Sequence, residues 1–258
     1  MMPEDARDLT YPGGQVRLYL DAPLKPGAEV SADEGQTHYL LHVMRAKEGD
    51  RVRLFNGRDG EFLAVVAKAA KRAVKLVCEK QIRAQSAEPD IWLLFAPIKR
   101  APIDSLVEKA AELGVARLLP VITRRTIAAR VNLDRLRAHA IEAAEQSDRL
   151  SVPEIDAPRA LDAALKDWDP ARRLIFCDEG GDARPLADAA REASAPAAIL
   201  IGPEGGFDPA ERAMLRAQSF VIPASLGPRI LRADTAALAA LTIWQSVSGD
   251  WRKREGSA

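Results

Sequence analysis

Several features that would point directly to a function are missing from this sequence. Its 258 residues include 37 lysines and arginines and 37 acidic residues, so the net charge is zero and only local clusters can indicate nucleic-acid binding. No apolar run approaches the roughly 20 residues of a membrane-spanning helix. The N-terminal residues 1–14 are acidic and polar and lack the apolar core of a signal peptide. We therefore expect a cytoplasmic protein without a membrane segment.

Cysteine and histidine are also scarce, with two and three residues respectively. Cys78 and Cys177 lie in separate apolar runs at no metal or redox spacing, which predicts buried free thiols in a reducing compartment. His38 and His42 would share one helix face, but no third ligand is evident beside them, and His139 stands apart. We therefore expect no metal site and assign the histidines a structural or RNA-contacting role.

The chain divides at a polar, proline-containing stretch, residues 84–89. We expect residues 1–14 to form a flexible tail. Residues 15–85 combine several short strand-like runs with one helix-like segment, Glu34–Arg45, which is typical of a small β-barrel. The strand-like runs are 17–21, 51–55, 61–67 and 73–80, with a hairpin loop at 56–60.

Residues 90–250 alternate continuous apolar strands with helices. The expected strands are 91–96, 117–122, 174–178, 197–201 and 220–224, and the expected helices are 103–113, 133–147, 185–192, one that begins with the N-cap motif DPAE at 208–211, and 236–247. Such runs are typical of a mainly parallel sheet covered by helices on both faces. The sequence therefore predicts an α/β domain after the small barrel.

Two loops in this α/β domain indicate a shared ligand site. The strand 197–201 leads into GPEGGF at 202–207, and the strand 220–224 leads into a second glycine-containing loop at 225–233. Ligands of open α/β sheets bind at the carboxyl ends of strands, where both loops lie. The first loop matches neither GxGxxG nor GxxxxGK[ST], and Glu204 would repel a phosphate. A ligand without phosphate is therefore favoured.

The second loop carries apolar and cationic residues together. Ile230 and Leu231 either pack in the core or offer a surface to a flat organic ring, and the pattern leaves both alternatives open. Arg232 either pairs with Asp234 or acts on the ligand. Asp234 or Thr235 is expected to cap the last helix.

These motifs carry a resemblance. GPEGGF at 202–207, followed by LGPRILRADTA at 226–236, resembles the signature of the RsmE family of SPOUT-class methyltransferases. The resemblance extends over nearly the whole chain. Its other segments are RLYLDAPL at 17–24, HYLLHVMRAKEGD at 38–50, KRAPIDSLVEKAAELGV at 99–115 and EAAEQSDR at 142–149.

The resemblance implies a SPOUT α/β fold with a C-terminal trefoil knot, preceded by a PUA-like RNA-binding barrel, in a homodimer. It also implies S-adenosylmethionine as methyl donor, held by the knotted loops largely through backbone groups. The cofactor-binding residues that it implies are Leu200, Gly202, Glu204, Gly205 and Gly206 in one loop, and Leu226, Gly227, Ile230, Leu231 and Arg232 in the other.

The implied activity is methylation of N3 of a specific uridine in 16S ribosomal RNA, on the assembled 30S subunit. Uridine N3 is a poor nucleophile until it loses its proton, so the site must remove that proton or stabilise charge that spreads onto O2 and O4. Arg232 is the candidate for charge stabilisation, and Glu204 for a base or an orienting group. A non-catalytic RNA-binding assembly factor on the same scaffold is the alternative. An ordinary Rossmann enzyme would need a phosphate loop that the sequence lacks.

Local clusters of positive charge supply candidates for RNA binding. Residues 68–83 and 117–137 are rich in lysine and arginine, and such runs either bind phosphates or form an ordinary solvated face. The specific candidates are Arg17 and Arg45 in the barrel, Arg124 and Arg125 in the second run, and Gln146 and Arg149 at a helix end.

Overall fold

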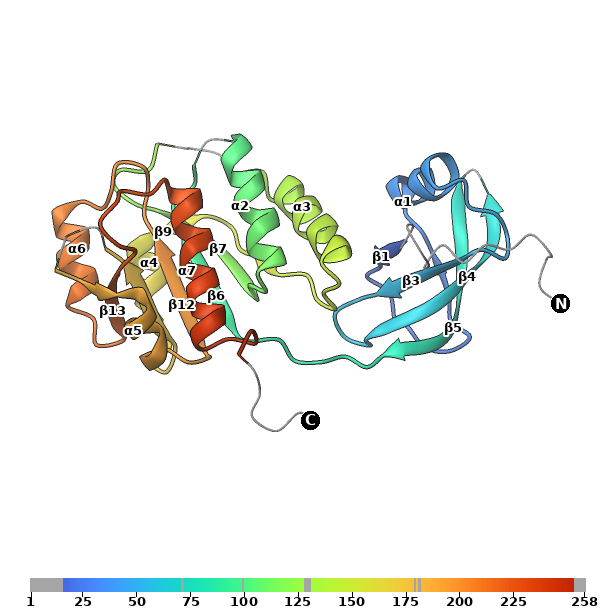
Figure 1. Cartoon of the computed structure of the whole chain (residues 1–258). Helices are drawn as coiled ribbons and strands as arrows, with labels where there is room; N and C mark the ends of the chain where they lie inside the picture. Colours follow the sequence, from blue (N-terminus) through green and yellow to red (C-terminus); the bar gives the residue numbers. More distant parts are fainter. Residues whose placement is uncertain are drawn as a thin grey trace. The chain divides into compact units, whose positions relative to one another are not determined.

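The structure is a computed structural model that describes residues 16–70, 72–98, 100–127, 131–178, 180 and 182–252. It contains two compact units (Figure 1). The first comprises the described residues up to Ala87 together with Ala144–Val152, and the second comprises Glu88–Ala143 together with the described residues from Pro153 onward. No change of composition marks the boundary at residue 144. The expected tail lies outside the described residues.

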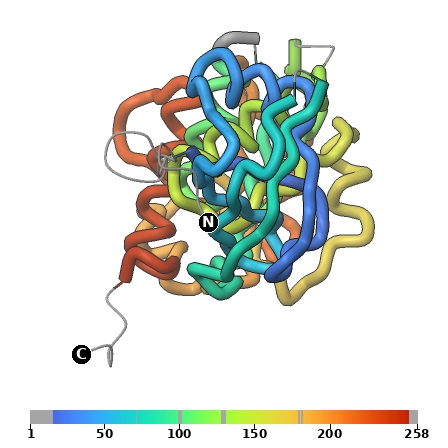
Figure 2. The backbone as a smooth tube through the Cα atoms, turned by 90° about the vertical axis from the view of Figure 1, so that its right-hand side faces the viewer, coloured from blue at the N-terminus to red at the C-terminus, as the bar shows by residue number. Residues whose placement is uncertain are grey.

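The first unit is built on a five-stranded mixed sheet with the order β1-β3-β4-β5-β2. β1 pairs with β3 in parallel, and the other pairs are antiparallel. The backbone of these strands is the blue-to-teal part of the tube in Figure 2. The strands are β1 (Arg17–Tyr19), β2 (Glu29–Ser31), β3 (Arg51–Phe55), β4 (Glu61–Ala70) and β5 (Ala73–Arg83). Four of these five confirm the sequence prediction. β2 was not predicted, because Val30 is the single apolar residue among its three.

The predicted helix of this unit is present, but it changes from an α-helix to a π-helix. α1 (Glu34–His38) begins at the N-cap Asp33, whose carboxylate accepts from the Gln36 amide in a capping box. A π-helical turn, η1 (Tyr39–Val43), continues it. The expected α-helix therefore ends early, and no residue type in the segment signals the wider turn.

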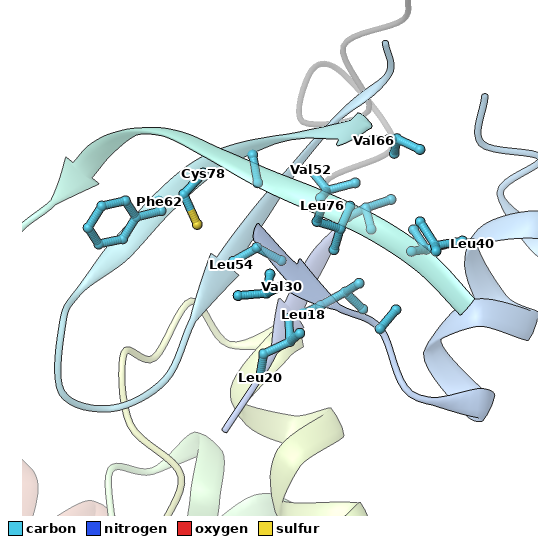
Figure 3. Packing of buried hydrophobic residues seen from close by; sticks show 14 of the residues in the cluster. Leu18, Leu20, Val30, Leu40, Val52, Leu54, Phe62, Val66, Leu76 and Cys78 are labelled. Carbon is cyan, nitrogen blue, oxygen red and sulfur yellow. The ribbon is translucent and has the colours of Figure 1, made fainter. Parts of the chain in front are cut away.

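Apolar side chains from all five strands and from η1 meet in the core of the first unit (Figure 3). Cys78 lies in this core and is 1% exposed. Burial raises the pKa of its thiol. The expectation of a buried free thiol is confirmed for this cysteine.

A buried ion pair links the sheet of the first unit to its segment 144–152. Arg17 Nε lies 2.5 Å from Glu61 Oε1, and both side chains are almost fully buried. The same guanidinium donates to the carbonyl oxygens of Ala144, Glu145 and Arg149. Arg17 thus holds the end of a helix against β1, and its donors are used inside the protein.

The second unit contains a parallel sheet with the strand order β11-β13-β10-β12-β6-β7-β8, and β9 pairs with the outer part of β7. The strands are β6 (Ile91–Phe95), β7 (Arg117–Ile122), β8 (Glu154–Ile155), β9 (Arg159–Ala160), β10 (Arg173–Cys177), β11 (Arg184–Pro185), β12 (Ala197–Ile201) and β13 (Val221–Ser225). The five longer strands and their parallel arrangement confirm the prediction. The three two-residue strands were not predicted.

Helices cover both faces of this sheet. Leu174, Phe176, Ala198 and Leu200 point to the face on which the buried residues of α4 and α6 also lie. α7 packs between α2 and α5 on the other face (Figure 1). The helices are α2 (Arg100–Glu112), α3 (Leu133–Gln146), α4 (Leu161–Lys166), α5 (Leu186–Glu192), α6 (Pro209–Arg216) and α7 (Ala233–Val247). Among the described residues, no helix has the length and apolarity that crossing a membrane requires.

Helix starts were predicted with unequal success. α6 begins as expected, because Asp208 accepts from the Ala210 amide and Glu211 closes the capping box behind Pro209. α7 corrects the prediction, since it begins at Ala233 with Arg232 as N-cap and no side-chain cap. The carboxylate of Asp234 instead accepts from the neighbouring Thr235 amide.

Removing one partner of the Arg17–Glu61 pair leaves a buried charge without compensation. We expect Glu61→Ala to lower the free energy of unfolding of the first unit by about 3 kcal/mol or more. The half-exposed Arg51–Glu79 pair in the same unit provides the matched control, and Glu79→Ala should cost less than about 1 kcal/mol. Urea unfolding followed by circular dichroism measures both, and equal costs would contradict the assigned role.

Candidate functional site

A cavity of about 250 Å³ opens at the carboxyl ends of β10, β12 and β13 in the second unit. Its walls come from the two glycine-containing loops, and the end of β10 contributes between them. The lining residues are Cys177, Asp178, Ile201–Glu204, Gly206, Phe207, Ala224–Leu231, Ala233 and Ala236. The predicted shared site of the two loops thus coincides with a cavity.

The first loop is shaped by a tight turn. The Gly206 amide donates to the Pro203 carbonyl at 2.9 Å, and Gly206 has a φ of +67°. Position 202 requires glycine because the Phe207 ring packs closely against its backbone, and a Cβ there would lie 2.4 Å from this ring. Phe207 packs edge-on against Phe176, which anchors the loop in the core. The backbone of this loop is therefore presented to the cavity with little side-chain cover.

The second loop is more exposed. Gly227 has a φ of +100°, and a side chain there would be strained although its position is open. Ile230 is 90% exposed, whereas Leu231 is half-buried, and both line the cavity. The structure therefore favours an apolar surface for Ile230 over the alternative of core packing.

The floor between the loops is formed by two residues that the sequence did not suggest. Cys177 is a free thiol but half-buried, which corrects the expectation that it is buried. Desolvation raises the pKa of its thiol to about 12, so this thiol stays neutral. The Asp178 carboxylate is buried and forms ion pairs with Arg212 at 2.9 Å and Arg216 at 2.7 Å, both from α6. A carboxylate at the very end of a predicted strand was the available signal for Asp178.

The ten predicted cofactor residues fall into two groups. Seven line the cavity: Gly202, Glu204, Gly206, Leu226, Gly227, Ile230 and Leu231. Leu200 lies in the core under α4 and α6, Gly205 lies outside the lining, and Arg232 is exposed at the start of α7. The two proposed catalytic residues, Glu204 and Arg232, are both exposed.

Arg124 contacts the start of α6, and Arg125 contacts the first glycine loop. Arg124 follows β7 and donates from Nη1 to Asp208 Oδ1 at 2.9 Å, while its amide donates to Glu211. Arg125 Nη1 donates to the Gly205 carbonyl at 3.0 Å. Both arginines are exposed, so they place positive charge beside the first glycine loop and the start of α6.

The other RNA-binding candidates, in the first unit, differ in exposure. Arg45 and Gln146 are exposed, and Arg45 has a φ of +52°. Arg17 and Arg149 are buried, at 4% and 7% exposure, which is not the surface position that RNA contact needs. Within the two basic runs, Lys71 and Arg130 lie outside the described residues.

None of the three histidines is among the residues that line the cavity. The rings of His38 and His42 are 4.8 Å apart, and His139 Nδ1 lies 2.8 Å from Glu108 Oε1. In the described part of the chain, no cluster of three or more histidine, cysteine or acidic side chains is arranged to hold a metal.

Family models match both units. An RNA methyltransferase domain model matches residues 85–245, and an RNA methyltransferase PUA domain model matches residues 32–78. The chain is 32% identical over 226 residues to the ribosomal RNA small subunit methyltransferase E of Rickettsia conorii, a match that spans 87% of this chain and 93% of that protein.

Solved structures are similar over the same length. A ribosomal RNA small subunit methyltransferase E from Neisseria gonorrhoeae, bound to S-adenosyl methionine, has a TM-score of 0.80 at 27% identity and covers 92% of this chain and 100% of its own. A Legionella pneumophila protein in complex with the bound cofactor SAM has a TM-score of 0.80 at 29% identity, with 92% and 99% covered. The SPOUT-type α/β fold with an N-terminal PUA-like unit, expected from the sequence, is confirmed.

The N-cap beside the cavity predicts a dependence of stability on pH. The Ala210 amide, aided by Arg124, holds the pKa of Asp208 below its usual range, so the cap stabilises the protein above the unfolded-state pKa and is lost as pH falls through the folded-state pKa. We expect Asp208→Ala to lower the Tm at pH 7, with a difference that shrinks below pH 4. Asp162→Ala, which removes an exposed carboxylate from α4 without removing an N-cap, is the control in the same thermal scans. A pH-independent difference would contradict this account.

Proposed function

Because the chain belongs to the family of the ribosomal RNA small subunit methyltransferases E, we propose that it transfers a methyl group from S-adenosylmethionine to N3 of a specific uridine in 16S ribosomal RNA. We propose the assembled 30S subunit as the substrate and a homodimer as the active form. The observation that carries the proposal is the cavity between the loops 202–207 and 226–231, the two segments in which the sequence resembles the family signature.

The residues around the cavity suit this cofactor. Backbone of Gly202, Gly206 and Gly227 and the apolar side chains of Leu226 and Leu231 form the walls, as a flat adenine ring and a ribose require. The two carboxylates in the lining differ. That of Asp178 is neutralised by two arginines, whereas Glu204 makes no ion pair with any described residue. Glu204 is therefore the acidic group that complements a cationic ligand.

When bound, the cofactor supplies a methyl group already activated on a sulfonium. The protein then has to position the uridine and manage its N3 proton. Arg232 lies at the exposed start of α7, where its guanidinium can stabilise negative charge on O2 or O4. Glu204, at the rim, is the candidate to accept or orient the N3 proton. The uridine base must be unpaired and turned out of the RNA helix to enter the cavity, because its N3 edge is hidden in paired RNA.

The RNA-binding surface follows from the exposed cations. Arg124 and Arg125, beside the start of α6 and the first glycine loop, and Arg45 in the first unit are the arginines that we retain as phosphate contacts. Arg17 and Arg149 support the first unit from inside instead. Gln146, exposed at the end of α3, remains a candidate for a base or sugar contact.

The reaction is tested with 30S subunits purified from cells that lack the gene for this protein. Incubation with labelled S-adenosylmethionine should produce 3-methyluridine at one position of 16S ribosomal RNA, mapped by mass spectrometry of nuclease fragments, and naked 16S ribosomal RNA should react more slowly. A methyl group on another base or on a ribose would overturn the assignment. Tight binding to 30S subunits without cofactor binding or methylation would favour the alternative, an assembly factor.

The role of Arg232 makes a separate prediction. Since its side chain makes no capping hydrogen bond at α7, Arg232→Ala should leave the Tm near that of the wild type. The loss of charge stabilisation should lower kcat by about 100-fold or more. Single-turnover methylation of 30S subunits, beside a melting curve, separates the two effects. A kcat within threefold of the wild type would remove Arg232 from the reaction.

A further inference from the structure

We propose that Arg125 is a positioning residue that locks the peptide between Gly205 and Gly206 in the orientation that binds S-adenosylmethionine. The inference rests on the proposed function of the cavity and assigns to this arginine a task beyond contact with RNA. It is carried by one hydrogen bond, from Arg125 Nη1 to the Gly205 carbonyl at 3.0 Å.

The two ends of this peptide are held by different parts of the protein. Its N–H, on Gly206, donates to the Pro203 carbonyl inside the turn. Its C=O, on Gly205, points in the opposite direction because the peptide is planar and trans, and there it meets Arg125. Rotation of the peptide would break both hydrogen bonds.

An external lock is needed because both flanking residues are glycines. Without Cβ atoms, Gly205 and Gly206 can rotate about the bonds on each side of the peptide at low cost. Gly206 lines the cavity, so a rotated peptide would present a different wall to the ligand. The loop would then have to be ordered during binding, which weakens affinity.

Arg125 is suited to this task by its place in the second unit. Its neighbour Arg124 is fixed to α6 twice, through its amide to Glu211 and through its side chain to Asp208. Thr123 and Thr126 bond to each other, which closes the turn after β7. The guanidinium therefore extends from a fixed turn, and its contact with Gly205 restrains the loop.

Gly205 itself provides an independent test. Its backbone does not adopt a positive φ, and an added Cβ would lie 3.7 Å from Arg125 Cβ, an ordinary contact. Alanine at this position restricts backbone rotation without strain. If Arg125 acts by restraining the peptide, Gly205→Ala should compensate for its loss. If it acts only through its charge, alanine should bring no compensation.

The experiment measures the Kd of S-adenosylmethionine by titration calorimetry on the full chain, without RNA. Arg125→Ala should raise the Kd by about tenfold, and Arg125→Lys, which retains one charged donor, should recover part of the loss. The double variant Arg125→Ala, Gly205→Ala should bind more tightly than Arg125→Ala alone. Arg173→Ala is the matched control, because this half-buried arginine also donates to a loop carbonyl, that of Ser219, at the other end of β10.

The Kd values and the melting curve together decide whether Arg125 restrains the peptide. An Arg125→Ala variant that melts like the wild type and shows the expected Kd values supports the lock. An unchanged Kd in Arg125→Ala overturns it, and so does a weakened Kd that Gly205→Ala fails to improve. If the wild type itself does not bind S-adenosylmethionine, the proposed function fails first and the inference with it.

Discussion

The position of β10 between β12 and β13 is the constraint on which the site depends. Neighbouring strands are separated by roughly 4.8 Å, so the loops that follow β12 and β13 emerge about 10 Å apart with the end of β10 between them. This gap becomes the cavity, and β10 supplies its floor through Cys177 and Asp178. Two arginines of α6 form ion pairs with Asp178, so this helix compensates the negative charge at the floor of the cavity.

Arginines serve two purposes that the sequence alone does not separate. Arg17 is buried in the first unit, where it pairs with Glu61 and donates to a carbonyl at the end of α3. Arg124 and Arg125 are exposed, yet they too make internal contacts, with Asp208 and the Gly205 carbonyl. The number of lysines and arginines therefore overestimates how many cations can contact phosphates. The chain has as many acidic as basic residues, so many of its cations can pair within the protein.

Much of the architecture could be predicted, because apolar periodicity and capping residues act locally. The longer strands, the Asp208 cap and the two ligand loops followed from such signals. The start of α7 did not, since Arg232 caps it through the backbone alone. Asp178 stands at the end of a predicted strand, but its place between the two loops follows from the strand order, which no local pattern encodes. Burial of Arg17 likewise depends on residues more than a hundred positions away. The uses of Glu204 and Arg232 remain predictions.

A crystal structure of this protein with S-adenosylmethionine tests the central claim most directly. We expect the ligand between the loops 202–207 and 226–231, next to Cys177 and Asp178, with the Gly205–Gly206 peptide in the orientation that Arg125 fixes. A ligand bound elsewhere in the second unit, or a cavity between these loops that stays empty at saturating ligand, would contradict it.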